Sequence, residues 1–262
     1  MISCKLNLFS NTLSIHSDCR ILLPDGCHRD TKIPVLWLCH GGNGDENEWL
    51  YHSSIAEISD EAGIAAVLVN AEDSCFVDMV YGKRFSAWIG EELPQILYRM
   101  FPVMSSARED NYICGLSNGG YGSLLIGLSY PERFGAVGAF SAGDKADARY
   151  VPAKDGEITP RIRIYGQEDI RDTRYSIRAL ARSVSFNSSM KPLIYHACGQ
   201  EDPWLDLNIL FKDTMTELND PAFCYVYEEM EGYGHEWKFW DTSLRRFLDY
   251  LNQSLPERKS KG

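Results

Sequence analysis

The chain has 262 residues, of which 37 are acidic and 26 basic, so its formal net charge at pH 7 is −11. Nucleic acids and anionic membrane surfaces repel an acidic protein, which argues against either as the main partner. We therefore expect a small-molecule substrate, with no nucleic-acid and no membrane partner. This length suits one large core, so a single domain over residues 1–262 is expected, while the oligomeric state is not indicated.

The sequence shows neither the pattern of an export signal nor a metal-binding motif. The first ten residues lack a basic segment followed by a long apolar core, and no later stretch approaches a membrane span, so we expect a cytoplasmic protein. The eight cysteines are scattered without a Cys-x-x-Cys pair. Cys39, Cys114, Cys198 and Cys224 lie in or beside apolar runs, which predicts buried free thiols. The six histidines have no metal-ligand spacing, so no metal site is predicted.

Strand-like and helical patterns alternate along the chain. The first thirty residues contain the turn signal Pro24-Asp25-Gly26 and predict an antiparallel hairpin that starts the sheet. Apolar runs predict strands at residues 35–39, 64–70, 112–115, 136–140, 162–165, 193–197 and 223–227. Helical patterns cover residues 89–101, 121–129, 207–218 and 244–251, and Pro94 predicts that the first of these begins or kinks there. This alternation predicts an α/β fold with a mostly parallel central sheet and helices on both faces.

Residues 141–191 have a different character from the rest of the chain. They are polar, contain several glycines and prolines, and include a charged helix-like stretch over residues 175–184. One interpretation is a short cap-like insertion over the active site. The other is a solvated surface loop, because charge-rich stretches are usually exposed.

A Gly-x-Ser-x-Gly pentapeptide, formed around Gly115, Ser117 and Gly119, lies between a predicted strand and a predicted helix. Small residues are needed at such a turn because the backbone passes close to its neighbours while the serine hydroxyl projects above the sheet. Ser117 is therefore the candidate nucleophile of a serine hydrolase. A glycine-rich turn without a catalytic role is the alternative interpretation.

A serine hydroxyl needs a base within hydrogen-bond reach and a group that orients the base. His235 lies in a glycine-rich loop between the last apolar run and the terminal helix, where it can turn toward Ser117. His196 lies inside an apolar run and is expected to be a hydrogen-bonded core residue. The remaining histidines, His16, His28 and His52, precede the serine on surface-like segments.

For the orienting acid, the sequence offers Gly-Gln-Glu-Asp twice, at residues 166–169 and 199–202. Asp202 follows the strand predicted at 193–197, so its carboxylate should lie at the same carboxyl edge of the sheet as the serine and the histidine. Asp169 opens the polar segment and is more typical of a turn or a helix cap. The order Ser117, Asp202, His235 is the order expected in an open α/β sheet.

The tetrahedral intermediate needs two hydrogen-bond donors for its oxyanion. One is predicted to be the backbone amide of Asn118, directly after the serine. The other is expected in the loop His40-Gly41-Gly42-Asn43-Gly44, where the amide of Gly42 is the candidate. We expect His40 to hold this loop rather than to act as a base. The reaction requires no cofactor.

Together, Leu38-Cys39-His40-Gly41-Gly42, the Ser117 segment, Cys198-Gly199-Gln200-Glu201-Asp202 and Gly234-His235-Glu236-Trp237 resemble the esterase D superfamily of α/β-hydrolases. The likeness is strongest to bacterial tributyrin esterases, which are short-chain carboxylesterases and acetylesterases, and it covers nearly the whole chain. It implies Ser117 as nucleophile, Asp202 as orienting acid, His235 as base, and Gly42 and Asn118 as oxyanion donors.

The chain departs from those esterases at two positions of the motifs. They usually carry Met after the serine and often a large residue after the His-Gly pair, where this chain has Asn118 and Gly42. A smaller or more polar pocket wall is therefore expected. Aromatic residues flank the motif loops, and Trp49, Tyr121 and Trp204 are the candidate substrate contacts. Ordinary core and rim packing is the alternative for each of them.

The predicted function is hydrolysis of short-chain, acetyl-type esters through an acyl-enzyme, with acetylated or feruloylated carbohydrates as candidate substrates. One alternative is a thioesterase of the S-formylglutathione hydrolase type. A second is a non-catalytic binding protein with the α/β-hydrolase fold. A third is acyl transfer to an alcohol, since the same residues serve both outcomes.

Overall fold

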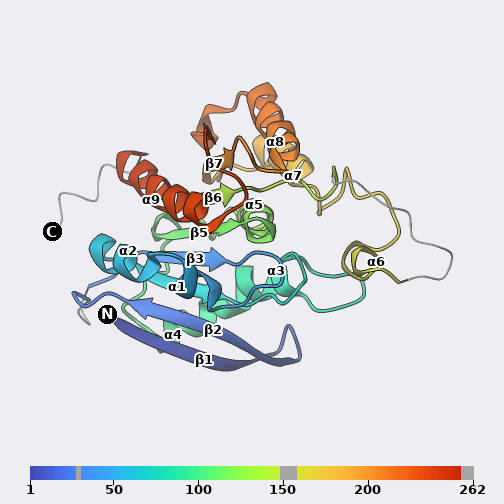
Figure 1. Ribbon diagram of the computed structural model, residues 1–262. Helices are drawn as coiled ribbons and strands as arrows, with labels where there is room; N and C mark the ends of the chain where they lie inside the picture. The colour runs from blue at the N-terminus through green and yellow to red at the C-terminus, as the bar shows by residue number, and fades with distance from the viewer. Residues whose placement is uncertain (28–30, 148–157, 255–262) are drawn as a thin grey trace.

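In the computed structural model, which describes residues 1–27, 31–147 and 158–254, one eight-stranded sheet has the order β1-β2-β4-β3-β5-β6-β7-β8 (Figure 1). The strands β3 to β8 run parallel to one another. Strand β2 runs opposite to them and pairs antiparallel with β4 on one side and with β1 on the other. The strands are β1 Ile2–Ser10, β2 Ile15–Leu23, β3 Val35–Cys39, β4 Ala65–Val69, β5 Asn111–Leu116, β6 Ala136–Phe140, β7 Leu193–Gly199 and β8 Val226–Met230. The predicted mostly parallel sheet is confirmed.

Helices cover both faces of this sheet because its central strands are apolar on both sides. One face packs against the segment from α3 to α4, and against α5, α7 and α8, while α1, α2 and α9 cover the other. The helices are α1 Glu48–His52, α2 Ile55–Ala62, α3 Phe85–Ala87, the π-helix η1 Trp88–Glu92, α4 Leu93–Met100, η2 Arg108–Asp110, α5 Asn118–Ser129, α6 Pro160–Tyr165, α7 Ile177–Asn187, α8 Leu205–Leu218, η3 Pro221–Phe223 and α9 Trp237–Ser254. This layered arrangement is the α/β-hydrolase fold.

The predicted N-terminal hairpin forms one edge of the sheet, in dark blue in Figure 1. Its turn lies between Ser10 and Ile15, where the carboxylate of Glu92 accepts hydrogen bonds from the Ser10 hydroxyl at 2.7 Å and the Thr12 amide at 2.9 Å. The Pro24-Asp25-Gly26 turn comes after β2. Pro94 stands in the first turn of α4, directly after the π-helical turn η1, so the predicted break in this helix is confirmed.

One predicted strand is wrong, and another starts later than predicted. Residues 162–165 form part of α6, because Thr159 caps this helix by accepting a hydrogen bond from the Ile162 amide and Pro160 opens its first turn. Residues 223–227 begin as the 3₁₀ turn η3, and the strand β8 starts only at Val226. At 162–165 alternating apolar residues resembled a strand, and at 223–227 a continuous apolar run did, while the capping residues Thr159 and Asp220 signalled helical turns.

The described part of the segment 141–191 packs on the molecule through specific contacts. In α7, Ile177, Ala181 and Val184 are buried in the core. The helix α6 is held to the loop before α3 by hydrogen bonds from the amides of Val80 and Tyr81 to carbonyls of α6. Residues 148–157 of this segment lie outside the described residues. A cap over the active site, like the single-domain organisation, stays a prediction.

All eight cysteines are free thiols. Cys39, Cys114 and Cys198 are buried as predicted, but Cys224 is exposed because it follows η3 in a turn with a left-handed backbone. Among the described residues, no helix combines the length and apolar character needed to span a bilayer.

Candidate active site

Ser117 lies on a sharp turn between β5 and α5. Its φ is +53° and its ψ is −116°, a conformation that is costly for a residue with a side chain. The Ser117 amide donates to the carbonyl of Phe140 at 2.8 Å, which fixes the turn against β6. A Cβ atom at Gly119 would collide with the carbonyl oxygens of Cys39 and His40. The predicted strand-turn-helix context and the need for small residues in it are confirmed.

The structure brings Ser117, His235 and Asp202 into one hydrogen-bonded chain. His235 Nε2 lies 3.1 Å from Ser117 Oγ, and His235 Nδ1 lies 2.8 Å from Asp202 Oδ2. Ser117 follows β5, Asp202 follows β7 and His235 follows β8. The carboxyl ends of these parallel strands share one edge of the sheet. The topology therefore explains why residues far apart in sequence meet.

The Asp202 carboxylate is enclosed and well supplied with donors. Its side chain has 0% of its surface exposed, and its Oδ1 accepts a hydrogen bond from the Trp204 amide at 2.8 Å. Burial acts to raise the pKa of Asp202, but the hydrogen bonds from His235, Ser141 and the Trp204 amide outweigh it, so the pKa lies below its usual value. The carboxylate therefore stays charged and can orient the Nδ1–H of His235.

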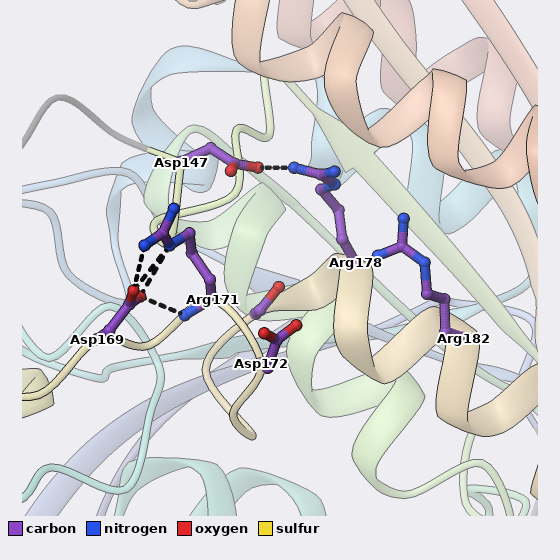
Figure 2. Close-up of a pocket in the computed structure, with 7 residues that line it drawn as sticks. Asp147, Asp169, Arg171, Asp172, Arg178 and Arg182 are labelled. Carbon is purple, nitrogen blue, oxygen red and sulfur yellow. Dashed lines mark hydrogen bonds and ion pairs between the residues drawn. The ribbon is translucent and has the colours of Figure 1, made fainter.

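The second Gly-Gln-Glu-Asp segment is tied to the loop that carries His235. The Glu201 amide donates to the Tyr233 carbonyl, and the Gln200 amide donates to the Met230 carbonyl, each at 2.9 Å. By contrast, Asp169 accepts hydrogen bonds from the backbone and guanidinium of Arg171 in an exposed turn (Figure 2). The structure brings Asp202 to the site and leaves Asp169 as a turn residue.

The other histidines have structural surroundings. His196 is fully buried, where its Nε2 donates to Asn208 Oδ1 and its Nδ1 accepts from the Tyr225 hydroxyl, both at 2.9 Å. Its burial lowers its pKa to about 4, so the ring is neutral. The predicted core role of His196 is confirmed. His16 and His52 are exposed and lie against Phe9 and Trp237, while His28 lies outside the described residues.

His40 holds the loop after β3, as predicted. Its Nε2 accepts from the Ala71 amide at 3.1 Å, so its Nδ1 carries the proton and donates to the Gly41 carbonyl at 2.7 Å. Burial lowers the pKa of His40, which keeps the ring neutral. In a trans peptide the carbonyl and the following N–H point in opposite directions, so the Gly42 N–H is directed away from the ring.

Gly42 and Asn118, the two candidate oxyanion donors, are neighbours in space. A Cβ atom built on Gly42 would lie 3.0 Å from Asn118 Nδ2. Asn118 is the first residue of α5, and the leading N–H groups of a helix have no partner within the helix. The side chain of Asn118 thus occupies the space beside Gly42, while its backbone amide remains available to a ligand.

Burial contradicts two of the three predicted substrate contacts. Trp49 is 1% exposed, and its indole donates to the Cys39 carbonyl at 3.0 Å beneath the loop. Tyr121 is 0% exposed, and its hydroxyl donates to the Tyr175 carbonyl at 2.6 Å. Both side chains pack in the core because the helices α1 and α5 direct them inward. Trp204 is 45% exposed and remains a candidate.

A separate hollow of about 250 Å³ lies beside α7 and contains none of the residues Ser117, Asp202 and His235. Its lining consists of Asp147, Asp169, Arg171, Asp172, Ser176, Arg178 and Arg182. Acidic and basic side chains pair with each other across it, as Asp147 does with Arg178 (Figure 2).

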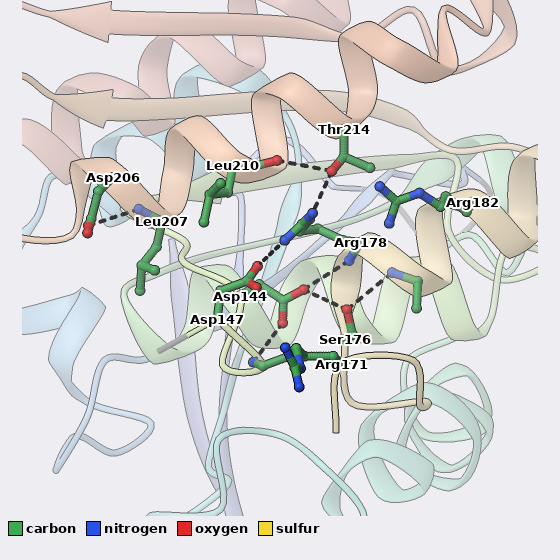
Figure 3. Close-up of polar contacts among 12 residues, drawn as sticks. Asp144, Asp147, Arg171, Ser176, Arg178, Arg182, Asp206, Leu207, Leu210 and Thr214 are labelled. Carbon is green, nitrogen blue, oxygen red and sulfur yellow. Dashed lines mark hydrogen bonds and ion pairs between the residues drawn. The ribbon is translucent and has the colours of Figure 1, made fainter. Parts of the chain in front are cut away.

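Asp144 fastens the loop after β6 to the start of α7 beside this hollow. Its carboxylate accepts hydrogen bonds from the Ser176 hydroxyl at 2.8 Å and the Arg178 amide at 3.1 Å (Figure 3). Because these bonds and the ion pairs of the hollow join parts of the same chain, they stabilise the attachment of α7.

Two residues at the site were not foreseen from the sequence, Ser141 and Trp240. Ser141 directly follows the strand predicted at 136–140, so the rule that places functional groups at the carboxyl edge could have indicated it. Trp240 packs its ring edge-on against His235, with 4.9 Å between ring centroids. Within the described part of the chain, no group of three or more His, Cys, Asp and Glu side chains could hold a metal ion.

An α/β sheet that carries a serine on a strained turn, a histidine and a buried carboxylate at its carboxyl edge defines a serine hydrolase of the α/β-hydrolase fold. A family model named Esterase, described as "Putative esterase", matches residues 10–251. The chain belongs to this esterase family, and it is a serine hydrolase that acts on carboxylic ester bonds.

Relatives of two kinds are similar in sequence. An acetyl esterase from Caldicellulosiruptor saccharolyticus is 29% identical over 232 residues, covering 85% of this chain and 84% of the relative. An S-formylglutathione hydrolase from Paracoccus denitrificans (strain Pd 1222) is 28% identical over 142 residues, which cover 46% of this chain and 49% of that protein.

The fold recurs in a solved structure. The fluorophosphonate-binding serine hydrolase FphF from Staphylococcus aureus has a TM-score of 0.84 and 24% identity, with 95% of this chain and 98% of that chain covered. This likeness supports the fold.

Proposed function

We propose that Ser117, His235 and Asp202 are the catalytic triad of a carboxylesterase that removes short, acetyl-type acyl groups through an acyl-enzyme. The main support for this proposal is the hydrogen-bonded chain in which His235 lies 3.1 Å from the Ser117 hydroxyl and 2.8 Å from the buried carboxylate of Asp202. This is the arrangement that activates a serine: the imidazole can accept the hydroxyl proton, and the carboxylate stabilises the imidazolium that results.

Acylation begins when Ser117 Oγ attacks the carbonyl carbon of the ester and its proton passes to His235 Nε2. The carbonyl oxygen becomes an oxyanion, which accepts hydrogen bonds from the backbone amides of Gly42 and Asn118. The start of α5 adds a favourable partial positive charge there. The tetrahedral intermediate collapses when His235 returns the proton to the leaving alkoxide, so that an alcohol departs and the acyl group stays on Ser117.

Deacylation repeats these steps with water. His235 Nε2 removes a proton from a water molecule, whose oxygen attacks the acyl carbon. The second tetrahedral intermediate releases the carboxylic acid, and the proton on His235 restores the Ser117 hydroxyl. Every proton is accounted for by His235, so the cycle needs no cofactor.

The acyl group proposed is short because the similar acetyl esterase covers most of the chain. For the alcohol, we propose an acetylated or feruloylated carbohydrate. The exposed ring of Trp204, which follows Asp202 closely in sequence, offers a stacking surface for a sugar or an aryl group. Replacing Trp204 by alanine should then raise KM for such substrates and leave kcat for p-nitrophenyl acetate nearly unchanged. An unchanged KM on acetylated sugars would argue against this contact.

The decisive experiment is hydrolysis of p-nitrophenyl acetate, butyrate and octanoate by the wild type, Ser117→Ala and Ser129→Ala. Ser129 is exposed at the other end of the same helix, so its variant is the matched control. We expect faster turnover of the two short esters, wild-type rates for Ser129→Ala, and a loss of about 10⁵-fold or more for Ser117→Ala. Equal rates for Ser117→Ala and wild type would refute the assignment.

A thioesterase is the second candidate, favoured by the match to S-formylglutathione hydrolase over part of the chain. The same triad cleaves either bond, so the leaving group decides. Turnover of S-formylglutathione and of S-acetylglutathione should be compared with that of p-nitrophenyl acetate by kcat/KM. A higher kcat/KM for either thioester than for the oxyester would replace the esterase proposal with the thioesterase one.

A further inference from the structure

Ser141 is held in an unusual backbone conformation directly after β6. Its φ is +55°, in the left-handed region that residues other than glycine seldom adopt, and it is 2% exposed. The Ser141 amide donates to the Ala197 carbonyl at 2.9 Å, so the strained turn is anchored to β7. Strain of this kind persists where the surroundings enforce it, and it sets the direction of the side chain.

The Ser141 hydroxyl connects an indole to the buried carboxylate. Trp240 Nε1 donates to Ser141 Oγ at 3.1 Å, and the same hydroxyl lies near enough to the Asp202 carboxyl to help lower its pKa. An indole N–H can only donate, and a carboxylate can only accept. Ser141 Oγ therefore accepts from Trp240, and its own proton is available to the Asp202 carboxylate.

Trp240 also contacts the other end of the Asp202–His235 pair. It lies in the first turn of α9, is 6% exposed, and meets the His235 ring edge-on at an interplanar angle of 89°. Three contacts thus join four residues: Asp202 bonds His235, His235 packs on Trp240, and Trp240 bonds Ser141. The Ser141 hydroxyl in turn faces the electrostatic surroundings of Asp202, whose pKa it helps to lower. Each member comes from a different segment of the chain.

We propose that Ser141 and Trp240, named here the Ser141–Trp240 brace, are positioning residues that hold the Asp202–His235 pair in its orientation toward Ser117. This inference rests on the proposed triad. The brace acts on a carboxylate whose side chain is wholly shielded from solvent, so water cannot replace a donor that is removed. Losing the Ser141 hydroxyl removes the acceptor of the Trp240 indole and a polar group that stabilises the charged Asp202 carboxylate.

The first test compares Ser141→Ala and Ser141→Gly with Ser243→Ala. Alanine keeps the backbone strain and removes the hydroxyl, whereas glycine removes both. Ser243 is a buried serine of α9 that bonds only the Phe239 carbonyl among the described contacts, so it is the matched control. We expect kcat on p-nitrophenyl acetate to fall about 10- to 100-fold in both Ser141 variants, with KM nearly unchanged, and to remain near wild type in Ser243→Ala.

Trp240→Phe tests the other half of the brace, because phenylalanine keeps a ring edge near His235 and removes the indole N–H. A fall in kcat of about tenfold is expected. If both residues act through one path, the double variant Ser141→Ala/Trp240→Phe should lose less than the product of the two single losses. Losses that simply multiply would mean that the two residues act independently and would overturn the brace.

A spectroscopic measurement separates the brace from the esterase assignment. The proton between His235 Nδ1 and Asp202 should give a low-field ¹H NMR resonance, assigned by its loss in His235→Gln. It should persist in Ser117→Ala and Ser243→Ala, and shift or broaden in Ser141→Ala and Ser141→Gly. A shifted resonance in a protein that cleaves no ester would support the brace and remove the proposed function. An unmoved resonance with kcat within twofold of wild type in both Ser141 variants would overturn the brace while the triad stands.

Discussion

Residues 166–169 and 199–202 have the same sequence, Gly-Gln-Glu-Asp, and entirely different surroundings. The side chain of Asp202 is 0% exposed and bonds His235, whereas that of Asp169 is 56% exposed and bonds Arg171. The first tetrapeptide follows the short helix α6, and the second begins at the last residue of β7, which lies between the parallel strands β6 and β8. The identical local sequence therefore does not determine the role of the aspartate. Its role depends on the strand or helix that positions the carboxylate.

The largest predicted effect comes from replacing the two carboxylates, Asp202 and Asp169, by amides. Asp202→Asn should lower kcat by about 10⁴-fold, because the amide can impose the wrong tautomer on His235 and cannot stabilise its charged form. Asp169→Asn, the same change in the same tetrapeptide, should stay within about twofold of wild type, as expected for a surface substitution. The measurement is the rate of p-nitrophenyl acetate hydrolysis by both variants.

Thermal unfolding of both aspartate variants serves as the control, since a misfolded Asp202→Asn protein would also be inactive. A folded Asp202→Asn variant with near wild-type activity would remove Asp202 from the triad. A large loss in Asp169→Asn would show that the exposed tetrapeptide takes part in the reaction.

The first glycines of the two tetrapeptides should also respond differently. A Cβ atom at Gly199 would overlap the Tyr233 carbonyl, which belongs to the loop carrying His235. Gly199→Ala should therefore displace that loop, lower kcat at least tenfold, and reduce the free energy of unfolding by about 1–3 kcal/mol. Gly166 has ordinary contacts, but its φ of +79° and ψ of −167° suit glycine alone, so Gly166→Ala should cost about 1–3 kcal/mol from backbone strain.

Urea unfolding and steady-state kinetics on the two alanine variants give the test of the glycine positions. Full activity in Gly199→Ala would mean that the His235 loop adjusts without cost, and that the close backbone contact is not what aligns the triad. Gly166→Ala should keep its kcat, because the first tetrapeptide makes no contact with the triad residues.

His196, in the strand β7 that leads to the second tetrapeptide, should also lower the stability of the folded protein in acid. Burial lowers the pKa of His196 in β7 from 6.5 to about 4, so the unfolded chain binds a proton between these values while the folded chain does not. Stability is then present above pH 6.5 and is lost as the pH falls toward 4. From pH 7 to pH 5 this one residue should cost about 2 kcal/mol of unfolding free energy.

Urea titrations at pH 7 and pH 5 on the wild type and His196→Gln measure this pH effect. Glutamine does not titrate, so the variant should be less stable at pH 7 yet lose about 2 kcal/mol less than wild type between the two pH values. His40, also buried with a lowered pKa, contributes a loss of the same sign in both proteins. An identical pH dependence in the two proteins would contradict the neutral, buried state of His196.

The comparison also explains what could be predicted from the sequence. The meeting of Ser117, Asp202 and His235, the proposed triad, could be predicted because chain order and the carboxyl edge of a parallel sheet depend on topology, which apolar strand patterns indicate well. Side-chain direction could not: Trp49 and Tyr121 flank motif loops in sequence but point into the core. The alternation of Ile162 and Ile164 with arginines predicts a strand at 162–165, whereas Thr159 and Pro160 signal the helix start that the structure shows.

The smallest predicted effect concerns the exposed tetrapeptide and its neighbour Arg171. This guanidinium holds the pKa of Asp169 at about 2, well below its usual value, through hydrogen bonds from the side chain and the backbone. Both side chains are exposed, so water and salt replace most of the interaction when it is lost. Arg171→Ala should shift the unfolding midpoint by less than about 2 °C and leave kcat unchanged. A shift comparable to that of Gly199→Ala would mean that the ion pairs around the hollow beside α7 act as one network, and that the segment opened by Asp169 is more firmly attached than its exposure suggests.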